Sequence, residues 1–128
     1  MRVKVISSGH KLSEGTEVTF NTEYGVGKGL WVGEVPNFRS TRDVELDVQE
    51  ELIWGDTIVE VPSPEFAVSE QGGRTILQGM IESADANEVC VLRIGNSILL
   101  IHVTGSCPSP GMFVSVSTGC VLLYDTNL

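Results

Sequence analysis

The stretch of sequence that decides the fold class is VCVLRIGNSILLIHV, residues 89–103. Two runs rich in Val, Ile and Leu lie on either side of Gly95-Asn96, a pair of residues that is typical of turns. Short runs of this composition, bounded by turn residues, are typical of β-strands. Residues 89–103 therefore predict two successive strands of a β-meander.

The same pattern of short runs and turns recurs along the whole chain, and helical periodicity is almost absent. Many short strands at regular spacing predict an all-β protein, either a small β-barrel or a β-sandwich of about ten short strands. The expected strands are residues 3–6, 17–21, 30–35, 44–48, 57–61, 75–83, 88–94, 97–103, 112–116 and 120–124. A turn or two of helix is the alternative for residues 48–54, because Asp47 could cap it.

The second half of the chain resembles a five-stranded barrel of the oligonucleotide/oligosaccharide-binding type. A long first strand would bend near Gly79, since a glycine inside a strand is typical of such a bend. A meander through Val103 and a closing hairpin over residues 112–124 would complete the barrel. Barrels of this type bind nucleic acids, sugars or proteins, so the fold alone does not predict a function.

The length of 128 residues and the hydrophobic content of 41% predict one core and a single domain over residues 1–128. A weak internal repeat appears when residues 30–35 are laid over 76–81, and residues 55–61 over 95–101. A duplicated β-meander, residues 29–61 and 75–103, could explain it. Chance recurrence of strand-and-turn chemistry is the alternative.

Several features predict a cytoplasmic protein that binds no membrane. No apolar run is long enough to span a bilayer, and the N-terminus lacks the hydrophobic stretch of a signal peptide. The three cysteines, Cys90, Cys107 and Cys120, are odd in number and have no C-x-x-C spacing. They therefore argue against a disulfide framework and against a zinc site, and we expect a reducing compartment and no cofactor or metal.

The net charge of −9 argues against nucleic-acid binding, because such a chain repels a phosphate backbone. Much of this charge lies in residues 43–60, which hold seven carboxylates and no Lys or Arg. Alternation in a strand would direct Asp43, Glu45 and Asp47 to one face, roughly 6.6–7 Å apart. At that spacing the carboxylates repel one another unless a cation approaches, so the segment creates a local demand for positive charge.

Three interpretations of the acidic segment remain open. It could be a solvated face that keeps the domain soluble and protects a strand edge. It could instead be a docking surface, where carboxylates pair with a basic partner and tryptophans supply apolar anchors. A divalent cation site is the third, although one flat strand does not make several oxygens converge. The residues of the docking hypothesis are Asp43, Glu45, Asp47, Glu50, Glu51, Asp56, Trp31 and Trp54.

Residues 29–36 (GLWVGEVP), 44–48 (VELDV) and 54–56 (WGD) together resemble small β-rich bacterial immunity proteins encoded beside polymorphic or contact-dependent-inhibition toxins. The resemblance covers about residues 29–61. It implies a cytoplasmic protein that binds one cognate toxin domain and blocks its active site. Such proteins are frequently acidic because many of their toxins are basic nucleases, and they have no catalytic residues.

No catalytic signature is present in the sequence, so we expect a non-enzymatic binding protein. Two other classes of function remain as alternatives. One is a barrel module that binds an oligonucleotide or a sugar. The other is a small β-enzyme that uses a carboxylate together with His102 as acid or base. An edge strand could also join two copies of the chain as a homodimer.

Overall fold

The computed structural model describes residues 1–85, 88–106 and 108–126, and within them the chain forms twelve strands and no helix. The prediction of an all-β barrel protein is confirmed. The strands are β1 (Arg2–Lys11), β2 (Thr16–Thr22), β3 (Gly25–Val32), β4 (Thr41–Val48), β5 (Leu52–Ile53), β6 (Ile58–Glu60), β7 (Ala67–Gln71), β8 (Arg74–Ala84), β9 (Val89–Ile94), β10 (Ser97–Thr104), β11 (Phe113–Thr118) and β12 (Val121–Asp125).

Every strand expected from the sequence overlaps one of these, but β5 and β7 were not expected. The helical alternative for residues 48–54 is wrong, because these residues form the end of β4, a short linker and β5. The physical reason is pairing with a distant strand, since Leu52 and Ile53 lie opposite Val103 and Thr104 of β10. The turn that follows is closed locally, where the Thr57 hydroxyl accepts a hydrogen bond from the Ile53 backbone N–H at 2.8 Å.

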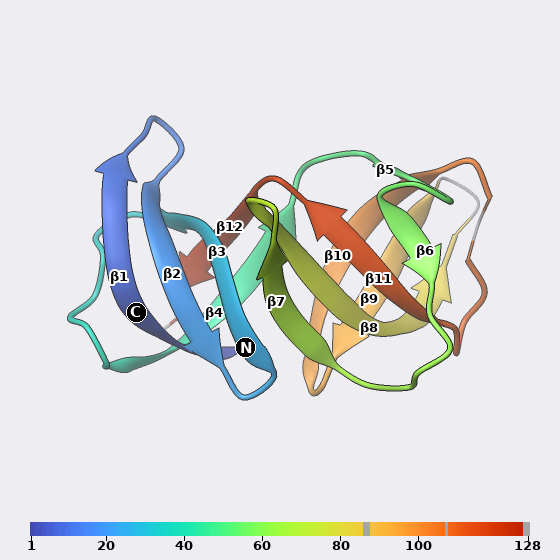
Figure 1. The fold of residues 1–128 in the computed structure, drawn as a ribbon, viewed down its shortest axis with the longest axis horizontal. Helices are drawn as coiled ribbons and strands as arrows, with labels where there is room; N and C mark the ends of the chain where they lie inside the picture. Colours follow the sequence, from blue (N-terminus) through green and yellow to red (C-terminus); the bar gives the residue numbers. More distant parts are fainter. Residues whose placement is uncertain (86–87, 107, 127–128) are drawn as a thin grey trace.

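Five strands close into the first barrel, at the left of Figure 1. Strands β1, β2 and β3 form an antiparallel meander, β3 pairs in parallel with β12, and β12 and β4 are antiparallel. The ring closes where β4 pairs with β1, Arg2 lying opposite Asp43. Four of the five strands come from residues 2–48, and the fifth, β12, comes from residues 121–125.

The predicted closing hairpin over residues 112–124 is therefore wrong. Strand β11 pairs with β6 and β8, whereas β12 crosses to the other barrel. The physical reason is the close fit of β12 against β3. Val121 and Leu123 are fully buried in the core, and Gly29 of β3 has no side chain to keep the β12 backbone away.

The remaining strands except β7 form a second barrel-like circuit with the same order of connections, at the right of Figure 1; here a turn of the chain between β5 and β6, and not a ladder, completes the ring. Strands β8, β9 and β10 form a meander, β10 pairs in parallel with β5, and β11 joins β6 to β8. Strands β5 and β6 together thus occupy the position that β12 has in the first barrel. Even the bulge between the first two strands recurs, after Val5 in β1 and after Ile81 in β8.

The two halves therefore exchange their fifth strands. The chain enters the second barrel through β5 and β6 and returns to the first through β12, so each barrel is completed by a strand from the other half. Strands β1 to β4 correspond to β8 to β11. This correspondence differs from the alignment suggested by the sequence, which lays residues 30–35, in and after the third strand, over residues 76–81 of the first strand.

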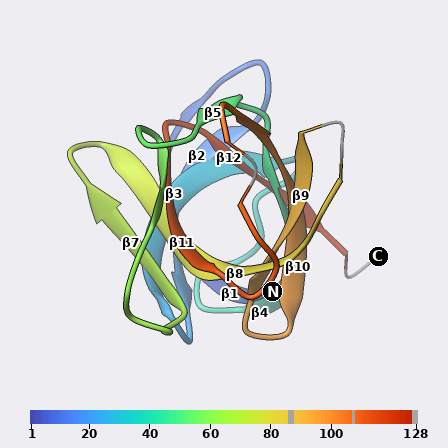
Figure 2. The ribbon, with the colours of Figure 1, turned by 90° about the vertical axis from the view of Figure 1, so that its right-hand side faces the viewer.

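Strand β7 joins the barrels on one side, pairing with β8 and meeting β3 where Gly25 lies opposite Val68. Viewed from the end in Figure 2, the strands of both halves encircle the same line of sight, so the barrels stand one behind the other. One cluster of buried apolar side chains runs through both of them. The barrels consequently share a core, and their junction becomes a place where surfaces from distant parts of the sequence meet.

Candidate functional site

Strand β4 presents the acidic segment in the alternating manner that the sequence predicts. Val44, Leu46 and Val48 are buried in the first barrel. Glu45 is exposed, and Asp47 is partly exposed on the same outer face. The strand thus sorts its side chains by parity, apolar inward and acidic outward.

Cations from distant parts of the chain meet some of the demand for positive charge. The Arg2 Nε atom lies 3.2 Å from Asp43 Oδ1, and an Arg74 guanidinium nitrogen lies 2.7 Å from Glu50 Oε1. Asp47 accepts a hydrogen bond from the Gln49 amide at 3.3 Å. Across residues 1–85, 88–106 and 108–126, no ion pair within 4 Å involves Glu45 or Asp47.

These two carboxylates line a groove of about 500 Å³ at the junction of the two barrels. Strands β4 and β12 of the first barrel form one wall, and β10 of the second barrel forms the other. The lining residues are Glu45, Leu46, Asp47, Ile98, Leu99, Leu100 and Tyr124. We call this hollow the junction groove.

The β10 wall of the junction groove is apolar and open to solvent. The exposed fraction is 63% for Ile98 and 57% for Leu100, and Tyr124 on β12 is 38% exposed. Leu46 and Leu99, which also line the groove, are buried. Carboxylates alone would be enough to keep a strand soluble, so solubility does not explain the exposed apolar side chains beside them. Such a combination is typical of an interaction surface.

The N-terminal ammonium group lies near one end of this arrangement. It donates a hydrogen bond to the Val44 carbonyl oxygen at 2.7 Å. Burial lowers the pKa of the Met1 amine, while the neighbouring charges of Asp43 and Glu45 raise it. The net effect is a lowered pKa, so burial outweighs the attraction of the two carboxylates for this ammonium group.

The other predicted docking residues lie outside the junction groove. Trp31 is fully buried in the first barrel, and its indole N–H has no hydrogen-bond partner among the described residues. The prediction that Trp31 anchors a partner is therefore wrong. Trp54 is half-buried and packs against the core, and Glu51 and Asp56 are exposed on the linker and the β5–β6 turn.

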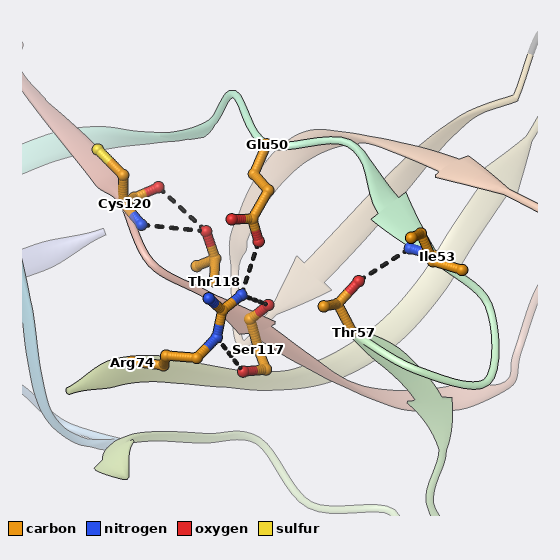
Figure 3. A network of polar contacts seen from close by, with 7 residues as sticks. All are labelled: Glu50, Ile53, Thr57, Arg74, Ser117, Thr118 and Cys120. Atoms are coloured by element: carbon orange, nitrogen blue, oxygen red, sulfur yellow. Dashed lines mark hydrogen bonds and ion pairs between the residues drawn. The ribbon is translucent and has the colours of Figure 1, made fainter. Parts of the chain in front are cut away.

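Glu50 has a structural role instead, shown in Figure 3. Arg74, at the start of β8, donates a hydrogen bond to Glu50 on the linker from β4 to β5. It also donates to the hydroxyl and the carbonyl oxygen of Ser117 at 2.8 and 3.0 Å. Ser117 lies just before the chain crosses from β11 to β12, so Arg74 ties both crossing segments together.

Replacing Arg74 with methionine, which keeps the apolar stem, should lower the free energy of unfolding by roughly 1–3 kcal/mol, because three charge-assisted contacts are lost. The matched control is Arg2→Met, since Arg2 has one ion pair at the surface and its side chain is 77% exposed. That variant should cost less than about 1 kcal/mol. Urea unfolding measures both, and equal stability of the two variants would show that the tie is unimportant.

Three other chemically reactive groups in the described part of the chain, Cys90, Cys120 and His102, lie apart from the junction groove lining. Cys90 is buried, and Cys107 lies outside the described residues. Burial raises the pKa of the Cys120 thiol, and Glu14, Glu50 and Asp47 raise it further, so the reactive thiolate is disfavoured. His102 follows Leu100 on the exposed face of β10, and no described carboxylate lies within 4 Å of its ring nitrogens.

Another hollow lies beside the β1–β2 hairpin, with a volume of about 570 Å³. Glu14, Glu17 and several hydroxyl and glycine residues line it, without an aromatic side chain. Its one basic residue, Lys28, is paired with Glu70 at 3.0 Å. A surface that stacks bases needs aromatic rings beside a basic groove, and this hollow has neither.

Sequence reasoning missed Ile98, Leu100 and Tyr124 as members of the candidate site. The run SILLIHV over residues 97–103 is apolar on both faces, which is typical of a strand buried on both sides. Only one face is buried here. A barrel strand with one buried face needs apolar side chains only at every second position. The extra apolar residues Ile98 and Leu100 were therefore the signal that could have identified this surface.

In comparisons with known proteins, no protein-family model, curated protein or solved structure matches the chain. Within the described residues, no group of three or more His, Cys, Asp or Glu side chains could hold a metal ion. The same part of the chain contains no helix that is long and apolar enough to cross a membrane.

Proposed function

We propose that this chain is a non-enzymatic binding protein that recognises a basic partner protein through the junction groove. The observation that carries the proposal is the placement of Glu45 and Asp47, unpaired with any described cation, beside the exposed apolar side chains of Ile98 and Leu100. Carboxylates of this kind steer a basic partner and pair with its Lys and Arg, while the apolar wall supplies contact area.

The resemblance to immunity proteins makes the partner more specific. We infer that it is a cognate toxin domain, of the basic nuclease type, whose active site is blocked in the cytoplasm. A nuclease must attract a phosphate backbone, so its active site presents the positive potential that the acidic wall would neutralise. The non-enzymatic assignment follows from the same mode of action, since blocking a site requires surface complementarity alone.

The test measures affinity for the toxin domain encoded beside the gene for this chain. The double variant Glu45→Lys, Asp47→Lys should weaken binding at least about tenfold, with most of the loss disappearing at high salt. The control is Asp56→Lys, Glu60→Lys, which makes the same change in net charge on the exposed β5–β6 region. Equal losses in both variants, or no neighbouring toxin gene, would contradict the proposal.

A further inference from the structure

The geometry points to a particular partner segment for the junction groove: an extended stretch of polypeptide in which basic and apolar side chains alternate. This inference rests on the proposed function and names the chemistry that the groove would select. It follows from three features of the groove, which are the character of its two walls, the spacing along each wall and the lack of an ion pair at its carboxylates among the described residues.

The two walls differ in character and come from different barrels. The β4 wall directs Glu45 and Asp47 into the groove, and the β10 wall directs Ile98 and Leu100 into it. Tyr124, opposite Glu45 on β12, adds an amphipathic side chain beside the acidic wall. A bound segment would therefore meet carboxylates on one side and hydrocarbon on the other.

The spacing along both walls is that of an extended chain. Glu45 and Asp47 are two residues apart in one strand, and so are Ile98 and Leu100 in the other, which sets a repeat of roughly 6.6–7 Å on each wall. An extended guest segment has the same repeat, and its successive side chains point in opposite directions. Every second side chain would reach the carboxylates, and those between would reach Ile98 and Leu100.

An α-helix fits this arrangement less well. Its side chains recur on one face at intervals of three and four residues, so an amphipathic helix gathers its basic residues on one broad side and its apolar residues on the other. Only an extended segment changes from basic to apolar at every residue. The pattern that matches two walls of period two is thus Lys or Arg alternating with Val, Ile or Leu.

The carboxylates are available for such a partner. In the described part of the chain, Glu45 and Asp47 have no ion pair within 4 Å, and the charge of Glu45 acts on the Met1 ammonium only as one of the effects that raise its pKa. Glu45 is exposed, and Asp47 is partly exposed with one long hydrogen bond from the Gln49 amide at 3.3 Å, so pairing them with lysines of a guest would replace few existing contacts. The charge of the guest is thereby specified as positive.

The test uses two synthetic heptapeptides, acetylated and amidated, with the same composition. One alternates, Lys-Val-Lys-Val-Lys-Val-Lys, and the other groups its lysines before its valines. Titration of the whole chain, followed by backbone amide shifts in NMR, should show the alternating peptide binding at least about tenfold more tightly. The largest shifts should fall on β4 and β10, at Glu45, Asp47, Ile98 and Leu100.

A pair of variants links this preference to the apolar wall. Ile98→Ser with Leu100→Ser should reduce affinity for the alternating peptide to that for the grouped peptide, and the fold should persist because both side chains are exposed. The matched control is Val26→Ser with Ile53→Ser, also at exposed positions, which should leave both affinities unchanged.

Failure of this inference differs from failure of the proposed function. Equal binding of the two peptides, tighter binding of a helical Lys/Leu peptide, or no binding of the alternating peptide would overturn the extended segment. The proposed function would still be tested separately, by the effect of the Glu45→Lys, Asp47→Lys variant on toxin binding.

Discussion

Leu123→Ala is expected to lower the free energy of unfolding by about 2–5 kcal/mol, because it opens a cavity in the core. Leu123 is fully buried on β12, where it lies between β3 and β4 of the first barrel. The same substitution at Leu100, which is 57% exposed, is the control and should change stability by less than about 0.5 kcal/mol.

The same variant tests the exchange of strands between the halves. Trp31 lies in the first barrel and Trp54 beside β5 of the second, and both contact the shared core. Loss of Leu123 should therefore shift one unfolding transition that fluorescence and circular dichroism report together. In hydrogen exchange, β3 and β4 should lose protection first. Greater loss in β11, the strand that precedes β12 in the sequence, would contradict the exchange.

Gly29→Val is the second change with a large expected effect. A Cβ atom on Gly29 would lie 2.5 Å from the Val121 carbonyl oxygen and 2.6 Å from Leu123 Cδ1, so the β12 backbone would have to move. We expect a loss of about 3 kcal/mol or more, or failure to fold. Gly29→Ala, with a smaller loss in the same direction, keeps the prediction measurable in a folded protein.

The matched control for Gly29→Val is Gly9→Val. Gly9 also lies within a strand, β1, but it is exposed, and the atoms nearest to an added Cβ belong to the Glu17 side chain at 3.3 Å or more. This variant should be nearly neutral, because valine suits a strand and Glu17 can move. Equal stability of the two valine variants would contradict the close approach of β12 to β3.

Several parts of the fold and of the site follow from local sequence. In β4, the alternation of Val44, Leu46 and Val48 with acidic residues assigns each side chain to a face without knowledge of the neighbouring strands. The residue types of the Gly95-Asn96 pair likewise predict the turn between β9 and β10. In the structure Gly95 adopts the positive φ, 61°, that such a turn requires. These predictions are confirmed since they depend on interactions within a few residues.

Trp31 shows where local reasoning fails. Its strand was expected to begin at residue 30, but β3 begins at Gly25 and places Trp31 on the same inward face as Gly27 and Gly29. Glycines give no apolar signal, so the inward row was invisible in the sequence. The space beside these glycines is filled by other segments, Phe20 and Val68 at Gly27 and the β12 residues Val121 and Leu123 at Gly29, while Trp31 is itself fully buried.

Glu50 and Ile98 illustrate the contribution of distant contacts. Glu50 seemed available to a partner because no cation lies near it in sequence, yet Arg74, from the start of β8, bonds to it. Ile98 seemed to belong to a core strand, yet the barrel covers only the opposite face of β10. Each outcome depends on which strands become neighbours.

By itself, the sequence determined that the chain folds into strands and that one face of residues 43–48 is acidic, because strand propensity and side-chain alternation act over a few residues. Only the tertiary structure decided that β12 completes the first barrel, that β5 and β6 complete the second, and that β4 meets β10 at the junction groove. These pairings join segments tens of residues apart, and packing against one shared core selects among them.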